Sequence, residues 1–252
     1  MQNYHVMKLS IVIPAYNEQD CIEDTLIRLS NTLSSEKIDH EILVINDHSN
    51  DNTPDILIRM ESEMPVLRHI TNEGTNGFGY AVRKGLNNFT GDCVAVFMAD
   101  MSDDPNDLVT FFRRMEKTDC DAVFGTRWKK GGKVYDYPKH KLWLNRLANN
   151  IIRLMFHIRY DDTTNAFKLY KRKTMEGLQP FISPHFNLTI ELPLKTIIRG
   201  YSYEILPNSW TNRKTGKSNL KIREMGTRYF FILLYCLIEK YFSKGDFNKK
   251  WD

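Results

Sequence analysis

The sequence predicts an α/β protein in which helices flank a doubly wound, Rossmann-like and mostly parallel β-sheet. Short apolar segments alternate with amphipathic segments of helical period through the first half of the chain. Polar turns rich in Asp and Asn follow the apolar segments, at the end of the strands where such sheets bind ligands. The content of 42% hydrophobic and 26% charged residues is that of an ordinary globular protein.

The alternation sets the expected elements of the first half. Strands are expected at residues 9–13, 41–45, 66–70, 94–97 and 121–124. Helices are expected through Ile22 and Leu29, from Pro54, from Tyr80 to about Asn88, and from Pro105 through Met115. Pro14 is expected to end the first strand, because proline cannot donate a ladder hydrogen bond.

The second half is less regular. Helices are expected at 142–156, at 188–198 despite Pro193, and at 222–242. A loop at 161–166 is expected to lead into a short strand, and another strand is expected at 203–206.

The segment Val94–Pro105 runs from a buried strand into three carboxylates, those of Asp100, Asp103 and Asp104. Clustered carboxylates at a strand end suit a divalent cation, which usually takes one or two of them plus substrate phosphates. Asp103 and Asp104 also fit an Asp-rich helix start, since Asp is a good N-cap and Pro105 suits the first turn. Asp100 precedes that cap, so we expect it at a metal or phosphate.

Residues that follow the first, second and fourth strands are expected to meet in one crevice. They are Pro14, Tyr16, Asn17 and Glu18, then Asn46, Asp47, Ser49 and Asp51, and finally Asp100. An aromatic ring and polar groups beside a metal-binding carboxylate describe a nucleotide site. A dinucleotide fingerprint at Gly77-x-Gly79 is disfavoured, because the third glycine is missing and the turn follows the third strand.

Seven segments carry a resemblance to a known family. They are IVIPAYNE, VINDHSNDNT, NGFGYAVRKGL, MADMSDDP, GTRW, DTTNAFKLYKR and NRKTGKSNLK. In this order they resemble the family 2 inverting glycosyltransferases, most closely the dolichol- or polyprenyl-phosphate sugar (mannose) synthases. The resemblance covers roughly residues 8–225 and implies a GT-A fold, a nucleotide-sugar donor and Mg²⁺ or Mn²⁺. The implied domain is 8–218, with a nucleotide-sugar half (8–127) and an acceptor half (128–218), followed by a C-terminal basic and apolar helix (219–252).

The resemblance also assigns roles to single residues. Nucleotide-sugar binding is implied for Pro14, Tyr16, Glu18, Asn46, Asp47 and Gly77, and metal binding for Asp100, with Asp103 as a further candidate. Arg127, Arg213 and Lys214 would meet donor or acceptor phosphates, and Asp162 would orient the acceptor loop.

Two positions depart from the family pattern. The usual Asp-x-Asp appears as Met98-Ala99-Asp100, so Asp103 or a water replaces the first acid, or Asp100 and the diphosphate hold the metal alone. Asn46 stands where an Asp often reads the base, and Asn both donates and accepts, which leaves GDP-, UDP- and CDP-sugars open. The lost acid also suggests a non-catalytic nucleotide-sugar-binding protein, although retention of Asp100, Arg127 and Arg213 argues against it.

The acceptor decides whether a general base is needed. A lipid phosphate is already mostly a dianion at neutral pH and needs none. A saccharide hydroxyl, as in cell-surface polysaccharide synthesis, needs a base, and Glu191 is the candidate. Glu191 could equally cap or solvate its helix.

Charge and cysteine usage bear on location. The net charge of +4 is too mild to indicate nucleic-acid binding, but the segment from Trp210 onward has ten basic and four acidic residues. The apolar run 229–238 is too short to span a bilayer. Together with four scattered cysteines and the lack of a signal-peptide pattern, this predicts a cytoplasmic protein. Peripheral membrane contact would place Phe230, Phe231 and Leu234 toward lipid and Arg228 and Lys240 near headgroups; a core helix or a homo-oligomer interface fits that helix equally well.

Overall fold

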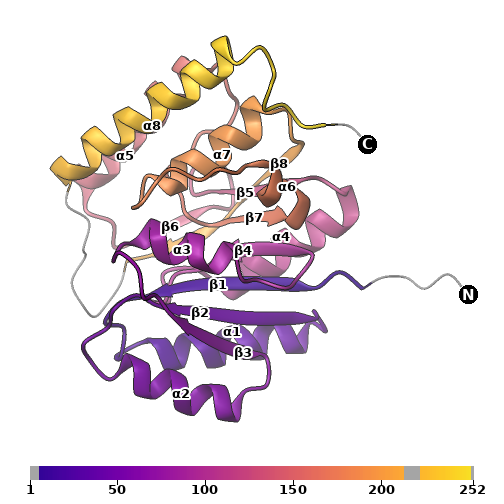
Figure 1. The fold of residues 1–252 in the computed structure, drawn as a ribbon, viewed down its shortest axis with the longest axis vertical. Helices are drawn as coiled ribbons and strands as arrows, with labels where there is room; N and C mark the ends of the chain where they lie inside the picture. Colours follow the sequence, from indigo (N-terminus) through magenta and orange to yellow (C-terminus); the bar gives the residue numbers. More distant parts are fainter. Residues whose placement is uncertain (1–5, 213–221, 251–252) are drawn as a thin grey trace, which may run out of the picture.

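The computed structural model describes residues 6–212 and 222–250. A seven-stranded sheet of order β3-β2-β1-β4-β7-β5-β8 lies at its centre (Figure 1). The strands are β1 (Leu9–Ala15), β2 (His40–Asn46), β3 (Leu67–Thr71), β4 (Cys93–Val96), β5 (Ala122–Thr126), β7 (Lys168–Lys171) and β8 (Tyr203–Pro207). Strand β7 is antiparallel to β4 and β5, whereas the other pairings are parallel. The predicted mostly parallel α/β sheet is confirmed.

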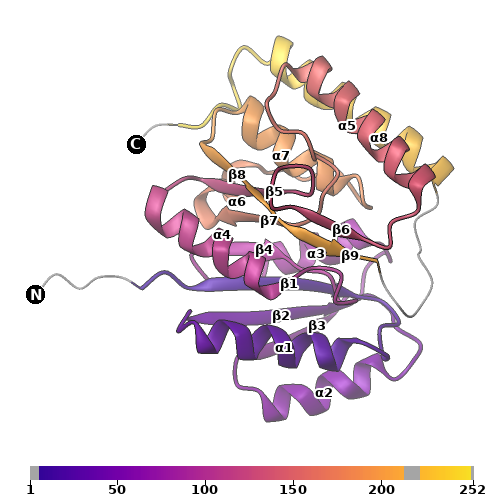
Figure 2. The ribbon, with the colours of Figure 1, turned by 180° about the vertical axis from the view of Figure 1, so that it is seen from behind.

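Helices cover both faces of the sheet and form two hydrophobic cores. One core contains α1 (Ile22–Ser35), α2 (Thr53–Glu63) and α4 (Pro105–Thr118). The other contains α3 (Phe78–Leu86), α5 (Lys139–Phe156), α6 (Arg172–Gly177), α7 (Leu188–Ile198) and α8 (Ile222–Phe242). Helices α5 and α8 lie side by side on the outside of this second layer (Figures 1 and 2).

Strand β1 continues through Pro14, where the sequence was expected to end it. The backbone polar groups of Val12 and Pro14 point to the same side of β1, toward β4. The Val12 carbonyl accepts a hydrogen bond from the Phe97 N–H, and the pairing with β4 ends there, so Pro14 lies beyond the end of β4. The missing N–H of Pro14 therefore costs no ladder bond. Three short elements were not predicted, namely β6 (Lys133–Tyr135), its parallel partner β9 (Ser209–Thr211) and α6.

The structure bears out the predicted bounds of the last helix and the helical state of the segment around Pro193. Within residues 6–212 and 222–250, no helix combines the length and the apolar character needed to cross a bilayer.

Candidate functional site

The loops after β1 and β2 are tied to each other by hydrogen bonds. The Asn17 N–H donates to Ser49 Oγ at 3.0 Å, and the Asn50 N–H donates to Asn17 Oδ1 at 2.7 Å. The Glu18 N–H donates to Thr53 Oγ1 at 2.9 Å, at the first turn of α2. Tyr16 lies in the same loop with 37% of its surface exposed. The structure thus presents an aromatic ring beside a braced pair of strand ends.

Asp47 anchors the glycine-rich loop that precedes α3. Its buried carboxylate accepts hydrogen bonds from Asn72 Nδ2 at 2.7 Å and from the Gly77 N–H at 2.8 Å. Gly77 has φ +151°, and a Cβ there would lie 2.9 Å from His185 Nδ1, so a side chain does not fit. The neighbouring Asn46 accepts the Ser49 N–H. Asn46, Asp47 and Gly77, predicted from separate motifs, therefore lie together, with the Asp47 carboxylate turned toward the loop.

Asp100 and Asp103 sit close enough at the end of β4 to interact. Asp100 is partly exposed and accepts the Ser102 N–H at 3.1 Å, whereas Asp103 is buried and accepts the Met98 N–H at 3.2 Å. Burial raises the pKa of Asp103 to about 7, and the negative charge of Asp100 adds to this rise. A cation beside Asp100 would offset this repulsion, and Asp100 would be its accessible ligand, because the Asp103 carboxylate is turned toward the backbone.

The side chains around Asp100 determine how a metal ion could be bound at the end of β4. In the described part of the chain, no group of three or more His, Cys, Asp or Glu side chains is arranged for a metal. A cation here would rely on Asp100 and substrate phosphates, which suits Mg²⁺. Asp104 is the N-cap of α4 and accepts the Asn106 N–H, with Pro105 in the first turn, so that prediction is confirmed.

Arg127 is committed to Asp162. Its Nε and Nη2 donate to the two carboxylate oxygens at 2.8 and 2.7 Å, and its backbone N–H donates at 3.0 Å. Both residues are buried. Burial alone would lower the pKa of Arg127, but the Asp162 charge reverses this and the net shift is upward. Arg127 is thus not an exposed phosphate clamp in this structure, and the pair fixes the start of the loop 162–165, where Asp162 was predicted to act.

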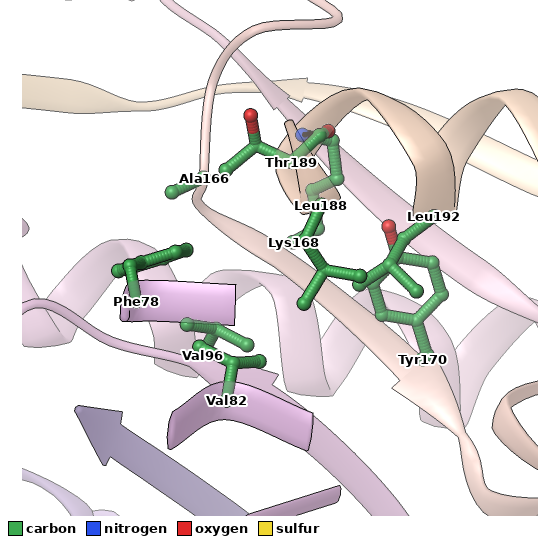
Figure 3. Close-up of a pocket in the computed structure, with 9 residues that line it drawn as sticks. All are labelled: Phe78, Val82, Val96, Ala166, Lys168, Tyr170, Leu188, Thr189 and Leu192. Carbon is green, nitrogen blue, oxygen red and sulfur yellow. Dashed lines mark hydrogen bonds between the residues drawn. The ribbon is translucent and has the colours of Figure 1, made fainter. Parts of the chain in front are cut away.

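Lys168 is a buried residue that the motifs did not single out. Its Nζ donates to the carbonyls of Thr163, Asn165 and Thr189, and burial lowers its pKa to about 7. It borders a cavity of about 10 Å³, room for about one water. Figure 3 shows Phe78 and Val82 of α3 on one side of this cavity and Leu188 and Thr189 of α7 on the other. A lone lysine in the apolar run AFKLY was the available signal.

Glu191 is fully buried, and its carboxylate has partners within the fold. Its Oε1 accepts the Ile182 N–H at 2.9 Å and pairs with Lys195 Nζ at 2.6 Å, while Oε2 accepts the Ser183 N–H at 2.8 Å. Both carboxylate oxygens are therefore occupied. This geometry does not support the catalytic-base role expected for a saccharide acceptor, and it makes Glu191 the anchor of the segment before α7.

The remaining predicted phosphate ligands, Arg213 and Lys214, lie outside the described residues. The strand just before them, β9, is described, and its Thr211 N–H donates to the Ser102 carbonyl at 2.9 Å. The loop that carries Asp100 thus contacts the strand that leads to both predicted ligands.

Helix α8 turns a row of apolar side chains to solvent. Phe230, Phe231 and Leu234, which were expected toward lipid, are 64%, 62% and 46% exposed. Lys240 does not reach outward as expected, because its Nζ donates to the Phe156 carbonyl at the end of α5. This hydrogen bond ties the two outer helices together.

Three kinds of comparison relate this chain to known proteins. Residues 10–178 match the family model described as "Glycosyl transferase family 2". The glycosyltransferase AglD of Haloferax volcanii is 27% identical over 217 residues, which are 85% of this chain and 35% of the relative. A dolichol-phosphate mannosyltransferase of Pyrococcus furiosus is 28% identical over 219 residues, 85% of this chain and 60% of the relative. The chain thus spans about one third to three fifths of the length of these relatives.

Solved structures agree in fold. Glucosyl-3-phosphoglycerate synthase from Mycobacterium tuberculosis in complex with UDP has a TM-score of 0.67 at 18% identity, covering 93% of this chain and 80% of that one. Its complex with Mn²⁺, UDP and phosphoglyceric acid has a TM-score of 0.68 at 18% identity, covering 93% and 78%. The likeness shows the fold, a GT-A-like arrangement of a mostly parallel sheet flanked by helices.

Proposed function

Because the chain belongs to glycosyl transferase family 2 and is a glycosyltransferase, we propose that it moves a hexose from a nucleotide sugar to a polyprenyl phosphate, using a divalent cation. The choice of acceptor rests on one observation: Glu191, the candidate general base, is fully buried and forms an ion pair with Lys195. A phosphate acceptor requires no base. The relative named dolichol-phosphate mannosyltransferase supports the same choice.

The donor would lie across the ends of β1, β2 and β4. Tyr16 offers a ring for the base, and Asn46 and the braced loop around Asn17 offer polar groups for its edge and the ribose. Asp100, at the end of β4, would hold Mg²⁺ or Mn²⁺ against the diphosphate. Such a cation stabilises the charge that develops on a leaving diphosphate, and the solved structures with Mn²⁺ and UDP support this choice of cofactor.

In the proposed reaction an acceptor phosphate oxygen attacks the anomeric carbon in line. A bond forms between these two atoms while the bond from the anomeric carbon to the diphosphate oxygen breaks, so the configuration inverts. The Arg127–Asp162 pair keeps the acceptor loop in place, and Arg213 and Lys214 would contact the phosphates.

The test is a transfer screen with purified protein and Mg²⁺ or Mn²⁺. GDP-, UDP- and CDP-sugars are offered with a short polyprenyl phosphate, with a saccharide acceptor, or with neither. We expect nucleotide release that rises with the lipid phosphate and is abolished by EDTA. Release that rises only with the saccharide would overturn the acceptor, and full activity in EDTA would overturn the metal.

A further inference from the structure

The loops after β1, β2 and β4 each contain a residue other than glycine in the left-handed region of backbone conformation. They are Asn17, His48 and Met101, with φ of 55°, 65° and 57°. This conformation is uncommon for residues other than glycine. Several further instances in the described chain lie at helix ends, where left-handed residues commonly terminate a helix, and Lys37 after α1 is one of them. His48 instead lies two positions after the end of strand β2.

Hydrogen bonds on both sides hold His48 in this conformation. Before it, the Asp47 carbonyl accepts a hydrogen bond from Asn76 Nδ2 at 3.0 Å. After it, the Ser49 N–H donates to Asn46 Oδ1 at 3.2 Å. Histidine tolerates the left-handed region better than most residues, but glycine would adopt it without strain. The turn therefore does not require a side chain at this position, and strained residues that the surrounding structure holds in place cluster at functional sites.

The imidazole of His48 lies partly exposed beside residues predicted to bind the nucleotide. Its side chain is 42% exposed, and its Nδ1 lies 3.5 Å from Oδ1 of the buried Asp47 carboxylate. A carboxylate beside Nδ1 favours the tautomer that carries the proton on Nδ1. Nε2, the other nitrogen of the neutral ring, is then a hydrogen-bond acceptor.

An acceptor is what this group of side chains otherwise lacks. The Asp47 carboxylate accepts hydrogen bonds from Asn72 Nδ2 and from the Gly77 N–H, so both of its oxygens have partners within the fold. Asn46 Oδ1 accepts a backbone N–H of the same turn, which leaves its Nδ2 to donate to a ligand. His48 Nε2 thus complements Asn46 by adding an acceptor beside a donor.

A nucleobase matches this pair of groups. Uracil, guanine and cytosine each carry an N–H donor next to an acceptor atom on one edge, and base edges are distinguished by such donor and acceptor patterns. The oxygens of an ionised diphosphate only accept hydrogen bonds, so they do not match Nε2 of the favoured tautomer. The base is therefore the part of the donor that suits His48.

We propose that His48 Nε2 accepts a hydrogen bond from an N–H of the nucleobase and thereby helps to select the base of the sugar donor. This inference rests on the proposed function, because it requires a nucleotide donor. It concerns nucleotide recognition alone, however, and can be tested without an acceptor and without transfer.

The experiment measures binding of UDP, GDP and CDP to the full chain by titration calorimetry in the presence of Mg²⁺. Pyrophosphate with Mg²⁺ serves as a probe that has no base. We expect His48→Gly to weaken the tightest-binding nucleotide about five- to tenfold, the loss typical of one hydrogen bond, and to narrow its advantage over the other two. Binding of pyrophosphate should not change. The melting temperature of the ligand-free variant should stay the same or rise, because glycine relieves the strain.

Two further variants separate the contributions of backbone and ring. Lys37→Gly makes the same change at the left-handed residue after α1, on an exposed surface, and should bind all probes like the unmodified protein. His48→Phe keeps a ring but has no acceptor, so it should lose nucleotide affinity as His48→Gly does. Thermal melting checks that each variant is folded.

Nucleotide binding that His48→Gly leaves unchanged would overturn this inference and leave the proposed function intact. Full affinity in His48→Phe would also overturn it, because the ring would then act without its nitrogen. A loss by the same factor for UDP, GDP and CDP would assign His48 to the ribose, and an equal loss for pyrophosphate would assign it to the diphosphate. If the unmodified protein binds none of the nucleotides, both this inference and the donor of the proposed function are wrong.

Discussion

Lys168 Nζ donates a hydrogen bond of 3.2 Å to the carbonyl of Thr189, the group that Pro193 leaves without its helical donor. The helix α7 therefore tolerates its proline because a side chain from β7 replaces the missing N–H. The same amine donates to the carbonyls of Thr163 and Asn165, in the loop that Asp162 begins. One buried lysine thus joins the acceptor-side loop to α7.

This placement makes stability depend on pH through Lys168. Its folded pKa of about 7 lies below the ordinary 10.5, so between these values the unfolded chain holds a proton that the folded chain has lost. Stability must then rise with pH across this window, with a slope of at most about 1.4 kcal/mol per pH unit from this group, and this gain is absent below pH 7.

Lys168→Met should therefore flatten the rise in unfolding free energy between pH 7 and 10, measured by urea denaturation at several pH values. The loss of the hydrogen bonds to Thr163, Asn165 and Thr189 lowers the curve as a whole but does not change its slope. Lys117→Met, on the exposed side of α4, is the matched control and should retain the slope. Parallel curves for both variants would contradict the assignment.

The buried Arg127–Asp162 pair predicts a strong coupling. Asp162→Asn should destabilise the fold by about 3–5 kcal/mol, because it leaves a buried guanidinium without its counter-charge. Arg127→Met/Asp162→Leu should be less destabilised than the single Asp162→Asn variant, since both charges are gone. The exposed pair Arg59–Glu23 is the comparison, and its loss should cost far less stability, because both groups stay in solvent. Additive effects of the two buried substitutions in denaturant unfolding would refute the coupling.

The sequence predicted those elements well that are long enough to show a hydrophobic period of their own. Strands β1 to β5, the last helix and the Asp104 cap lie close to their expected places for this reason. The short β6 and β9 were missed because three residues carry no period, and they exist through mutual pairing. The end of β1 was misjudged because the tolerance of Pro14 depends on where β4 stops.

The candidate site, like the fold, was predictable in part from the sequence. The motifs predicted Asn46, Asp47 and Gly77 at the same site, and in the structure they lie together, because parallel strands end at one edge of the sheet. Motifs could not reveal which carboxylates are buried in contacts within the fold. Asp103, Asp162 and Glu191 each have a tertiary partner that only the folded chain supplies.

We predict that Glu191 stabilises the fold and does not act as a general base. Glu191→Gln should cost about 3–5 kcal/mol, because Lys195 would be left buried without its counter-charge. At a temperature where the variant is folded, we expect kcat to fall less than tenfold and its pH profile to keep its shape. Removing a general base typically costs about 10²–10⁴-fold. A loss of that size with an altered pH profile would restore the saccharide acceptor as the leading choice.

Asp100 and Asp104 offer a matched test of the metal, since they lie four positions apart in one segment and differ in role. Asp100→Asn should reduce transfer at least 100-fold and weaken the response to Mn²⁺, because the accessible carboxylate of the β4 end is lost. Asp104→Ala should cost about 1 kcal/mol of stability through the lost N-cap and leave metal response intact. Transfer and Mn²⁺ titration are measured for both. If Asp100→Asn keeps full activity while Asp103→Asn loses it, the cation is held by the buried acid, and Asp103 must turn away from the Met98 N–H to bind it.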